Sequence, residues 1–241
     1  MTAAGAIGLV GSGEFTPATQ DVDLTLLEGR PRRVVFLPTA AAPEGEAVLA
    51  KWVGMGVDHY ARLGVEATPL MVRTRDDAAS AALAAEIAGA GLIYLSGGDP
   101  AYLAATLTGS AVGEAIRDAW TAGTAVAGCS AGAVALMSQV PDVRAPGRPF
   151  VPGLGLIPLI MVLPHFDQLE HWVPGVTEWA LHALPDGMSL LGVEEDTALV
   201  GGPMEWRVMG RQRAWKLSHD GAPVSFASGE LLRLEAPAGS R

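Results

Sequence analysis

Short apolar runs alternate with longer amphipathic segments through the first half of the chain. Runs rich in β-branched and aliphatic residues favour strands, which we predict at Ala6–Val10, Arg33–Leu37, Ala67–Val72, Leu92–Leu95 and Thr124–Ala127. Between them, apolar residues recur at the helical interval, and we predict helices at Glu44–Leu63, Asp76–Ala88, Ala101–Thr106 and Val112–Ala122. Strands alternating with helices are typical of a parallel sheet that is covered by helices on both faces.

The pattern changes after Pro141. Gly and Pro interrupt the segment Pro146–Pro158, a strand is expected to end at Pro164, and one helix is predicted from about Asp167 to Ala183. The remaining residues are predicted to form short strands at Ser189–Val193, Ala198–Val200, Trp206–Met209, Ala214–Leu217 and Leu231–Leu234. We expect this β-rich tail to pair at one edge of the sheet. Because no linker-like segment divides the chain, residues 1–241 are predicted to form a single α/β domain.

Composition and charge narrow the classes of function. The apolar runs are short and interrupted by Gly, Pro or charged residues, so no membrane-spanning segment is expected. A formal net charge of −10 repels phosphate backbones, so nucleic acid is not an expected partner. The N-terminus lacks the positively charged region of a secretory signal, and the single cysteine, Cys129, cannot form an intramolecular disulfide. We therefore expect a cytoplasmic protein.

A nucleophile is predicted in the segment Gly128-Cys129-Ser130-Ala131-Gly132, which follows a buried strand and begins an Ala-rich helix. In such a G-x-S-x-G turn the glycines allow a sharp bend that exposes the central side chain, here Ser130. The N–H of Ala131 can then donate to a tetrahedral oxyanion at the helix N-terminus. Chance occurrence in a chain rich in Gly and Ala is the alternative, and the flanking strand and helix favour the functional interpretation.

A second glycine turn, Gly97-Gly98-Asp99, also follows a predicted strand. Both turns should therefore lie at the carboxyl edge of the parallel sheet, where open α/β sheets place their sites. The N–H of Gly98 is a candidate second oxyanion donor, and Asp99 is a candidate for substrate binding. The alternative is an ordinary turn in which Asp99 or a neighbour caps the next helix.

A serine nucleophile needs a base, and the sequence offers five histidines. His165 follows the strand that ends at Pro164 and precedes a helix, so its side chain can reach across the sheet edge. It is the preferred base. His59, His171 and His182 fall within predicted helices, where a solvated or packed imidazole is the default interpretation.

An acidic group should orient that imidazole, and the segment Gly192–Leu199 contains Glu194, Glu195 and Asp196 in succession. A solvated hairpin turn is the ordinary explanation for adjacent acids, and composition does not decide between the two. No cluster of His, Cys and Asp has the spacing of metal ligands, so no metal or other cofactor is expected.

These motifs together resemble the dipeptidase E and cyanophycinase family of serine peptidases, peptidase family S51. The resemblance runs from about Gly8 to Gly202, and the order of the motifs matches as well. The four motifs that carry the resemblance are Gly97-Gly98-Asp99, Gly128-Cys129-Ser130-Ala131-Gly132-Ala133, Pro164-His165-Phe166 and Gly192-Val193-Glu194-Glu195-Asp196-Thr197-Ala198.

The resemblance implies a three-layer, flavodoxin-like fold related to class I glutamine amidotransferases, with a mostly parallel sheet and a serine in place of their cysteine. It implies Ser130 as nucleophile, His165 as general base, and an oxyanion hole at Gly98 and Ala131. A glutamate of the segment G-x-x-E-x-T-A completes the triad in cyanophycinase-like members, which corresponds to Glu195. In dipeptidase E the third member is an aspartate soon after the serine, for which Asp142 is the nearest candidate. We prefer Glu195.

The chain departs from the family after the histidine. Cyanophycinase-like members carry an arginine-rich helix there, whereas Asp167–Trp172 contains no arginine. Since arginine suits bidentate carboxylate binding, a preference for acidic substrates would depend on Arg144 or Arg148 instead. Trp172 and Trp179 are a helical interval of seven apart. Core packing is the favoured interpretation of this pair, and an apolar pocket is the alternative.

We therefore expect an exopeptidase that hydrolyses a short peptide or isopeptide through an acyl-enzyme, with a homodimer as a candidate assembly. One alternative is an α/β-hydrolase-type esterase with His219 as base, although the Gly-rich oxyanion segment of that fold is absent. A cysteine enzyme is a second alternative, but Cys129 lies one place from the apex of the turn. A third is a non-catalytic module of the same fold that binds a small molecule or peptide.

Overall fold

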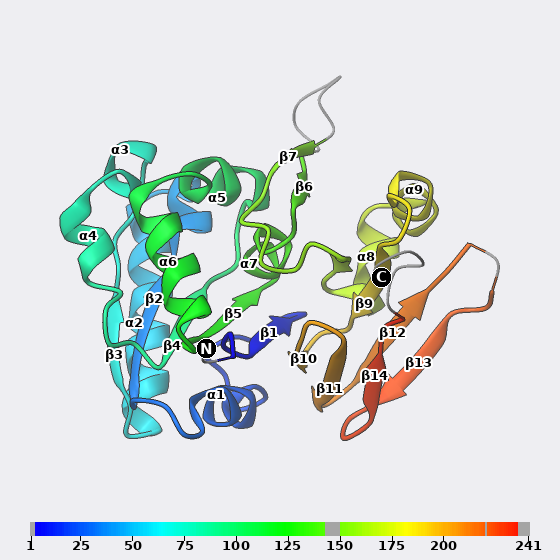
Figure 1. Ribbon diagram of the computed structural model, residues 1–241, viewed down its shortest axis with the longest axis horizontal. Coiled ribbons are helices and arrows are strands. Elements are labelled where there is room, and N and C mark those ends of the chain that lie inside the picture. Colours follow the sequence, from blue (N-terminus) through cyan, green and yellow to red (C-terminus); the bar gives the residue numbers. More distant parts are fainter. Residues whose placement is uncertain (1–2, 143–149, 220, 236–241) are drawn as a thin grey trace.

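An eight-stranded sheet crosses the computed structural model, which describes residues 3–142, 150–219 and 221–235 (Figure 1). Its strands lie in the order β14 (Leu231–Arg233), β11 (Glu205–Gly210), β10 (Thr197–Gly201), β1 (Ile7–Val10), β5 (Ala125–Cys129), β4 (Leu92–Leu95), β2 (Arg33–Leu37) and β3 (Glu66–Pro69). Strands β1 to β5 are parallel, and β10, β11 and β14 extend the sheet from β1 in antiparallel pairs. The predicted parallel strands are confirmed, with β3 shorter than expected.

Helices cover both faces of this sheet. Helices α1 (Gln20–Leu27) and α2 (Glu46–Arg62) bury apolar side chains against one face. The opposite face packs against a larger cluster, which is contributed by α3 (Arg75–Ala78), α4 (Ala81–Ala85), α5 (Pro100–Leu107), α6 (Ala111–Thr121) and α7 (Ala131–Ala135). The predicted three-layer architecture is confirmed. Within the described ranges, no helix is both long and apolar enough to cross a membrane.

Two predicted helices are each divided in two. At 76–88, Ser80 accepts a hydrogen bond from the Leu83 N–H and begins α4 as a separate helix. At 167–183, α8 (Phe166–Trp172) ends before Pro174, and α9 (Val176–Ala183) begins after Gly175, whose φ of 81° breaks the helical path. Helix α1 was not predicted, since its short segment carries acidic residues among apolar ones.

The prediction that the whole C-terminal tail pairs at one edge of the main sheet is wrong, because its strands are shared between two sheets. Strands β10, β11 and β14 join the main sheet, whereas β9 and β12 belong to a second sheet with the order β13 (Val224–Ala227), β12 (Arg213–Leu217), β9 (Ser189–Val193) and β8 (Ile160–Leu163). This second sheet lies beside α8 and α9 in Figure 1. The side chains of β9 are buried except for Ser189, and a strand with two buried faces needs a layer on each side.

Parallel strand pairs bring the predicted motifs together. Leu95 of β4 is level with Gly128 of β5, so the Gly97-Gly98 turn and Ser130 leave the main sheet at the same edge. In the second sheet, Leu163 of β8 is level with Gly192 of β9. The residues that follow these two strands, His165 and Glu195, therefore lie next to each other.

Candidate active site

Ser130 occupies a strained turn between β5 and α7. Its backbone has φ 52° and ψ −112°, a conformation that L-residues rarely adopt, and its N–H donates to the Val10 carbonyl at 2.9 Å. The flanking glycines allow close contact, because a Cβ atom on Gly128 would overlap the Gly132 carbonyl and one on Gly132 would overlap the Leu95 carbonyl. The G-x-S-x-G pattern thus reflects the approach of α7 to β4 and β5.

The steric need for glycine in this turn gives a stability prediction. We expect Gly128→Ala to lower the free energy of unfolding by about 2–3 kcal/mol, because backbone atoms rather than a flexible side chain meet the new methyl group. Gly54→Ala is the matched control: Gly54 lies on α2 with open space around its Cβ position, so a gain of up to ~1 kcal/mol is expected there. Urea unfolding measures the free energy of unfolding of each variant. Equal values for Gly128→Ala and Gly54→Ala would contradict a steric need for glycine at position 128.

His165 links Ser130 to Glu195 by two hydrogen bonds. It is in the left-handed conformation, φ 51° and ψ 36°, at the junction of β8 and α8. Its Nε2 lies 2.9 Å from the Ser130 Oγ, and its Nδ1 lies 3.0 Å from the Glu195 Oε1. When Nδ1–H donates to the carboxylate, Nε2 is free to accept the serine proton. The geometry is that of a nucleophile, a base and an orienting acid.

Residues around Glu195 hold its backbone in place. The Asp167 carboxylate accepts the Glu195 N–H at 2.8 Å, and the Glu195 carbonyl accepts from the Thr197 hydroxyl and the Gln212 side chain, each at 3.0 Å. Partial burial raises the pKa of Asp167, but hydrogen bonds led by that from the Glu195 N–H outweigh it, and the pKa lies below its ordinary value. Asp167 lies two positions after His165, and no local sequence signal predicted its contact with Glu195.

The other acids of the region have different partners. Both oxygens of Glu194 accept hydrogen bonds, from the Trp215 indole at 2.7 Å and the Arg213 N–H at 2.9 Å. Asp196 pairs with Arg211 at 3.3 Å. Asp142, the alternative third member of the triad, directly follows β6 (Gln139–Pro141), which pairs with β7 (Phe150–Pro152). The carboxylate that lies at His165 Nδ1 is that of Glu195. Arg144 and Arg148 lie outside the described residues.

Two backbone N–H groups are available near Ser130. Within the described part of the chain, neither the Gly98 N–H nor the Ala131 N–H has an acceptor, the latter because it opens α7. Gly98 has φ 139°, and a Cβ atom there would lie 2.8 Å from the Ala41 N, so the loop requires glycine. The Asp99 side chain accepts the Tyr102 N–H at 3.0 Å and caps α5, as in the alternative interpretation of this turn.

Cys129 is buried beneath the turn. It is 0% exposed, and its Sγ lies 2.7 Å from the Glu14 Oε2. Burial, and after it the nearby Glu14 carboxylate, raise the pKa of the thiol well above its ordinary value. A thiol that is both inaccessible and hard to ionise is a poor nucleophile, which opposes the cysteine-enzyme alternative.

Three of the other histidines have partners of their own, and His171 lies in the last turn of α8. His59 is buried and pairs with Asp23 at 2.7 Å, in agreement with a packed imidazole. The rings of His182 and His219 meet edge to face, with their centroids 6.1 Å apart, and His182 Nδ1 also bonds to the Glu178 carbonyl of its own helix. His165, not His219, is the histidine at Ser130, which opposes the esterase alternative.

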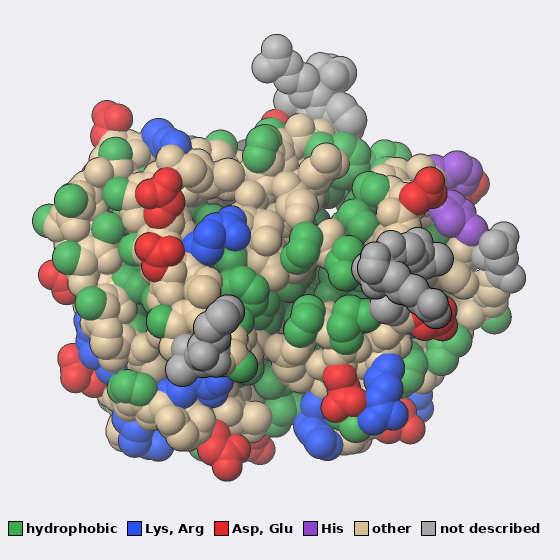
Figure 2. Space-filling view, in the orientation of Figure 1, with side chains coloured by type: hydrophobic (Ala, Val, Ile, Leu, Met, Phe, Trp, Pro, Cys, Tyr) green, Lys and Arg blue, Asp and Glu red, His purple; other side chains and the backbone are tan. Residues whose placement is uncertain are grey.

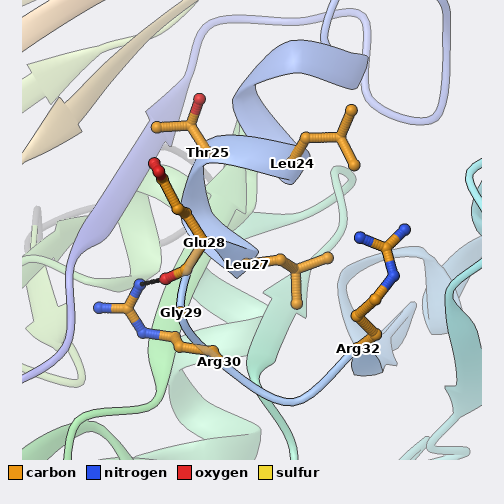
Figure 3. Close-up of a pocket in the computed structure, with 7 residues that line it drawn as sticks. All are labelled: Leu24, Thr25, Leu27, Glu28, Gly29, Arg30 and Arg32. Carbon is orange, nitrogen blue, oxygen red and sulfur yellow. Dashed lines mark hydrogen bonds between the residues drawn. The ribbon is translucent and has the colours of Figure 1, made fainter.

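A hollow at the end of α1 has no comparable chemistry (Figure 3). Its loop leads into the amino end of β2, opposite the edge that carries Ser130. The Arg30 guanidinium donates to the backbone carbonyls of Leu26, Glu28 and Gly123, and Arg32 donates to that of Leu63.

No group of three or more His, Cys, Asp or Glu that could hold a metal ion occurs among the described residues. On the face in Figure 2, basic side chains lie in separate groups beside acidic ones.

The chain is similar to known peptidases in sequence and in structure. A profile of peptidase family S51 matches residues 6–202. Cyanophycinases of Trichormus variabilis and a Nostoc species are each 29% identical over 150 residues, 58% of this chain and 49% of theirs. The chain thus spans about half the length of these curated relatives.

Solved structures extend the similarity over nearly the whole chain. A peptidase from an acI-B1 Actinobacterium has a TM-score of 0.88 and 35% identity over 96% of this chain and 97% of that chain. A putative peptidase E protein from Listeria monocytogenes EGD-e has a TM-score of 0.57 and 18% identity over 93% of this chain and 99% of its own, a likeness of fold.

Proposed function

Because the chain belongs to peptidase family S51, a family of serine-type peptidases, we propose that it is an exopeptidase that hydrolyses a short peptide or isopeptide through an acyl-enzyme. The hydrogen-bonded series Ser130, His165 and Glu195, with distances of 2.9 and 3.0 Å, is the observation that carries the proposal. No cofactor is needed for this chemistry.

In the proposed mechanism, His165 Nε2 takes the Ser130 proton while the Oγ attacks the amide carbonyl carbon. Glu195 stabilises the imidazolium that forms, and the N–H groups of Gly98 and Ala131 bind the oxyanion. The imidazolium then gives its proton to the leaving amine, and the C–N bond breaks. Water, deprotonated by the same nitrogen, releases the acyl group and restores Ser130.

The residues beside His165 bear on which substrate side chain the site would accept. The curated relatives are cyanophycinases, and arginines after the base would suit a substrate carboxylate, but neither α8 nor α9 contains one. Trp172 of α8 lies beside His165 instead: it is 57% exposed, and its ring centroid is 5.2 Å from that of His165. The expectation that Trp172 and Trp179 pack in the core was wrong: they lie on different helices, and Trp179 is 38% exposed.

The position of Trp172 supports an apolar residue on the leaving side of the scissile bond. Because the imidazolium must protonate the leaving amine, that part of the substrate passes next to His165. An exposed indole at this place provides a face for an aromatic or aliphatic side chain. A test of substrate specificity therefore compares a dipeptide with a small leaving residue, one with an aromatic leaving residue, and two that begin with aspartate.

Hydrolysis of a dipeptide panel tests the function and the specificity together. Wild type and Ser130→Ala are compared on Asp-Leu, β-Asp-Arg, Leu-Gly and Leu-Phe, and Ser130-dependent cleavage of any member supports the peptidase. Trp172→Ala is expected to lower kcat/KM for Leu-Phe about tenfold relative to Leu-Gly, the loss of ~1.4 kcal/mol of contact. An unchanged ratio would remove Trp172 from specificity. No cleavage by wild type would favour the non-catalytic binding module.

A further inference from the structure

A buried glutamate joins the two loops that carry the proposed oxyanion donors. Glu14 follows β1 and is only 6% exposed. Its Oε1 accepts the Gly97 N–H at 3.0 Å, and its Oε2 accepts the Cys129 S–H at 2.7 Å. Gly97 directly precedes Gly98, and Cys129 directly precedes Ser130. One carboxylate thus contacts both loops.

The Ser96–Asp99 loop shows what the Glu14 carboxylate does. The Ser96 N–H donates to the Leu37 carbonyl at 3.1 Å, and the Asp99 N–H donates to the Ala40 carbonyl at 2.8 Å. The Gly97 N–H is bound by Glu14, so among described residues only the Gly98 N–H of this loop lacks an acceptor. Among the residues that the structure describes, Glu14 is the only one whose side chain accepts a hydrogen bond from an N–H of the Ser96–Asp99 loop.

The loop also lies against the nucleophile. A Cβ atom on Gly97 would lie 3.6 Å from the Ser130 Cβ and 3.0 Å from the Glu14 Oε1. Glycine has wide conformational freedom, so two consecutive glycines do not hold one peptide orientation by themselves. A hydrogen bond at the first of them restricts the peptide that carries the second N–H.

We propose that Glu14 is a positioning residue for the oxyanion hole: by binding the Gly97 N–H, it holds the adjacent Gly98 N–H in place beside the nucleophile turn, while the Cys129 S–H occupies its second oxygen. The inference rests on the proposed peptidase function. It assigns the buried carboxylate a role in the transition state, in which the oxyanion exists, and little role in binding the substrate.

Three variants separate this role from a purely structural one. Glu14→Met removes both acceptors at similar volume and is expected to lower kcat by 10²- to 10³-fold, the effect of one lost oxyanion donor, with KM changed less than threefold. Glu14→Gln keeps an oxygen for the Gly97 N–H and turns its amide toward the sulfur, a weak acceptor, so kcat within about fivefold of wild type is expected. Cys129→Ala leaves the Gly97 contact in place and should also stay within fivefold.

The readouts are peptide hydrolysis, the rate of Ser130 labelling by a fluorophosphonate, and the affinity of a peptide boronate, whose adduct has a tetrahedral, anionic centre. We expect labelling rate and boronate affinity to fall with kcat in Glu14→Met and to recover in Glu14→Gln. Wild-type kcat in Glu14→Met would overturn the inference and leave the peptidase intact, whereas an unreactive wild type would overturn the peptidase itself. If Glu14→Met does not fold, Glu14→Asp, which withdraws the carboxylate by one methylene, should lose at least tenfold in kcat.

Discussion

Replacing Ser130 with alanine is expected to lower kcat by about 10⁵- to 10⁶-fold, because the variant lacks the oxygen that forms the acyl-enzyme. The Ser130 Oγ is 2.9 Å from the base, so the proton transfer that activates it needs no rearrangement. Residual hydrolysis should match the contribution of the oxyanion donors and of substrate binding. Steady-state kinetics on the best dipeptide of the panel measures the loss.

Cys129→Ala is the matched control for the nucleophile. A fluorophosphonate probe should label wild type and Cys129→Ala and should not label Ser130→Ala. Cys129 is adjacent to the nucleophile but is 0% exposed, and its pKa is raised, so removing its thiol takes away no reacting group. Labelling that survives in Ser130→Ala, or that disappears in Cys129→Ala alone, would contradict the assignment of the serine.

The sequence was sufficient for the features that arise from local pattern. The runs that form β2 and β4 were predicted to the residue, because buried parallel strands are continuous apolar segments bounded by polar residues or Gly. Two glycine turns after neighbouring parallel strands must meet at one edge, so the proximity of Gly98 and Ser130 followed from the fold class.

Features that depend on distant pairing were not accessible in the same way. Nothing in the local pattern of the tail shows that β9 pairs with β8 rather than with the main sheet, and this pairing brings Glu195 to His165. Glu14 is a single acid in a Gly-rich loop, and its partners Gly97 and Cys129 are far along the chain. No periodicity marks such a residue before the strands are placed.

The exposure of Trp172 was missed for a different reason. One continuous helix over 167–183 would align Trp172 with Trp179 on the same face, which favoured core packing. Pro174 and Gly175 interrupt that helix, and the Glu170 carboxylate binds the Gly175 N–H at the break. Pro174 and Gly175 are local signals for this break, and they override the helical interval of seven between the two tryptophans.

Glu195→Gln is expected to lower kcat by about 10⁴-fold with little change in KM, whereas Asp142→Asn should remain within twofold of wild type. The Glu195 carboxylate accepts the Nδ1–H of His165 at 3.0 Å and so leaves Nε2 unprotonated toward Ser130. An amide can present an N–H to Nδ1 instead, which favours the tautomer whose Nε2–H cannot take the serine proton.

Steady-state kinetics of the two variants on one dipeptide decides which carboxylate completes the triad. The Glu195→Gln substitution is not expected to disturb the local fold. The Glu195 backbone is held by hydrogen bonds with Asp167, Thr197 and Gln212, and these do not involve the Glu195 side chain. The loss in Glu195→Gln should therefore occur without a loss of thermal stability. A large loss in Asp142→Asn with a near-normal Glu195→Gln would transfer the role to Asp142, and equal small losses would mean that neither carboxylate orients the imidazole.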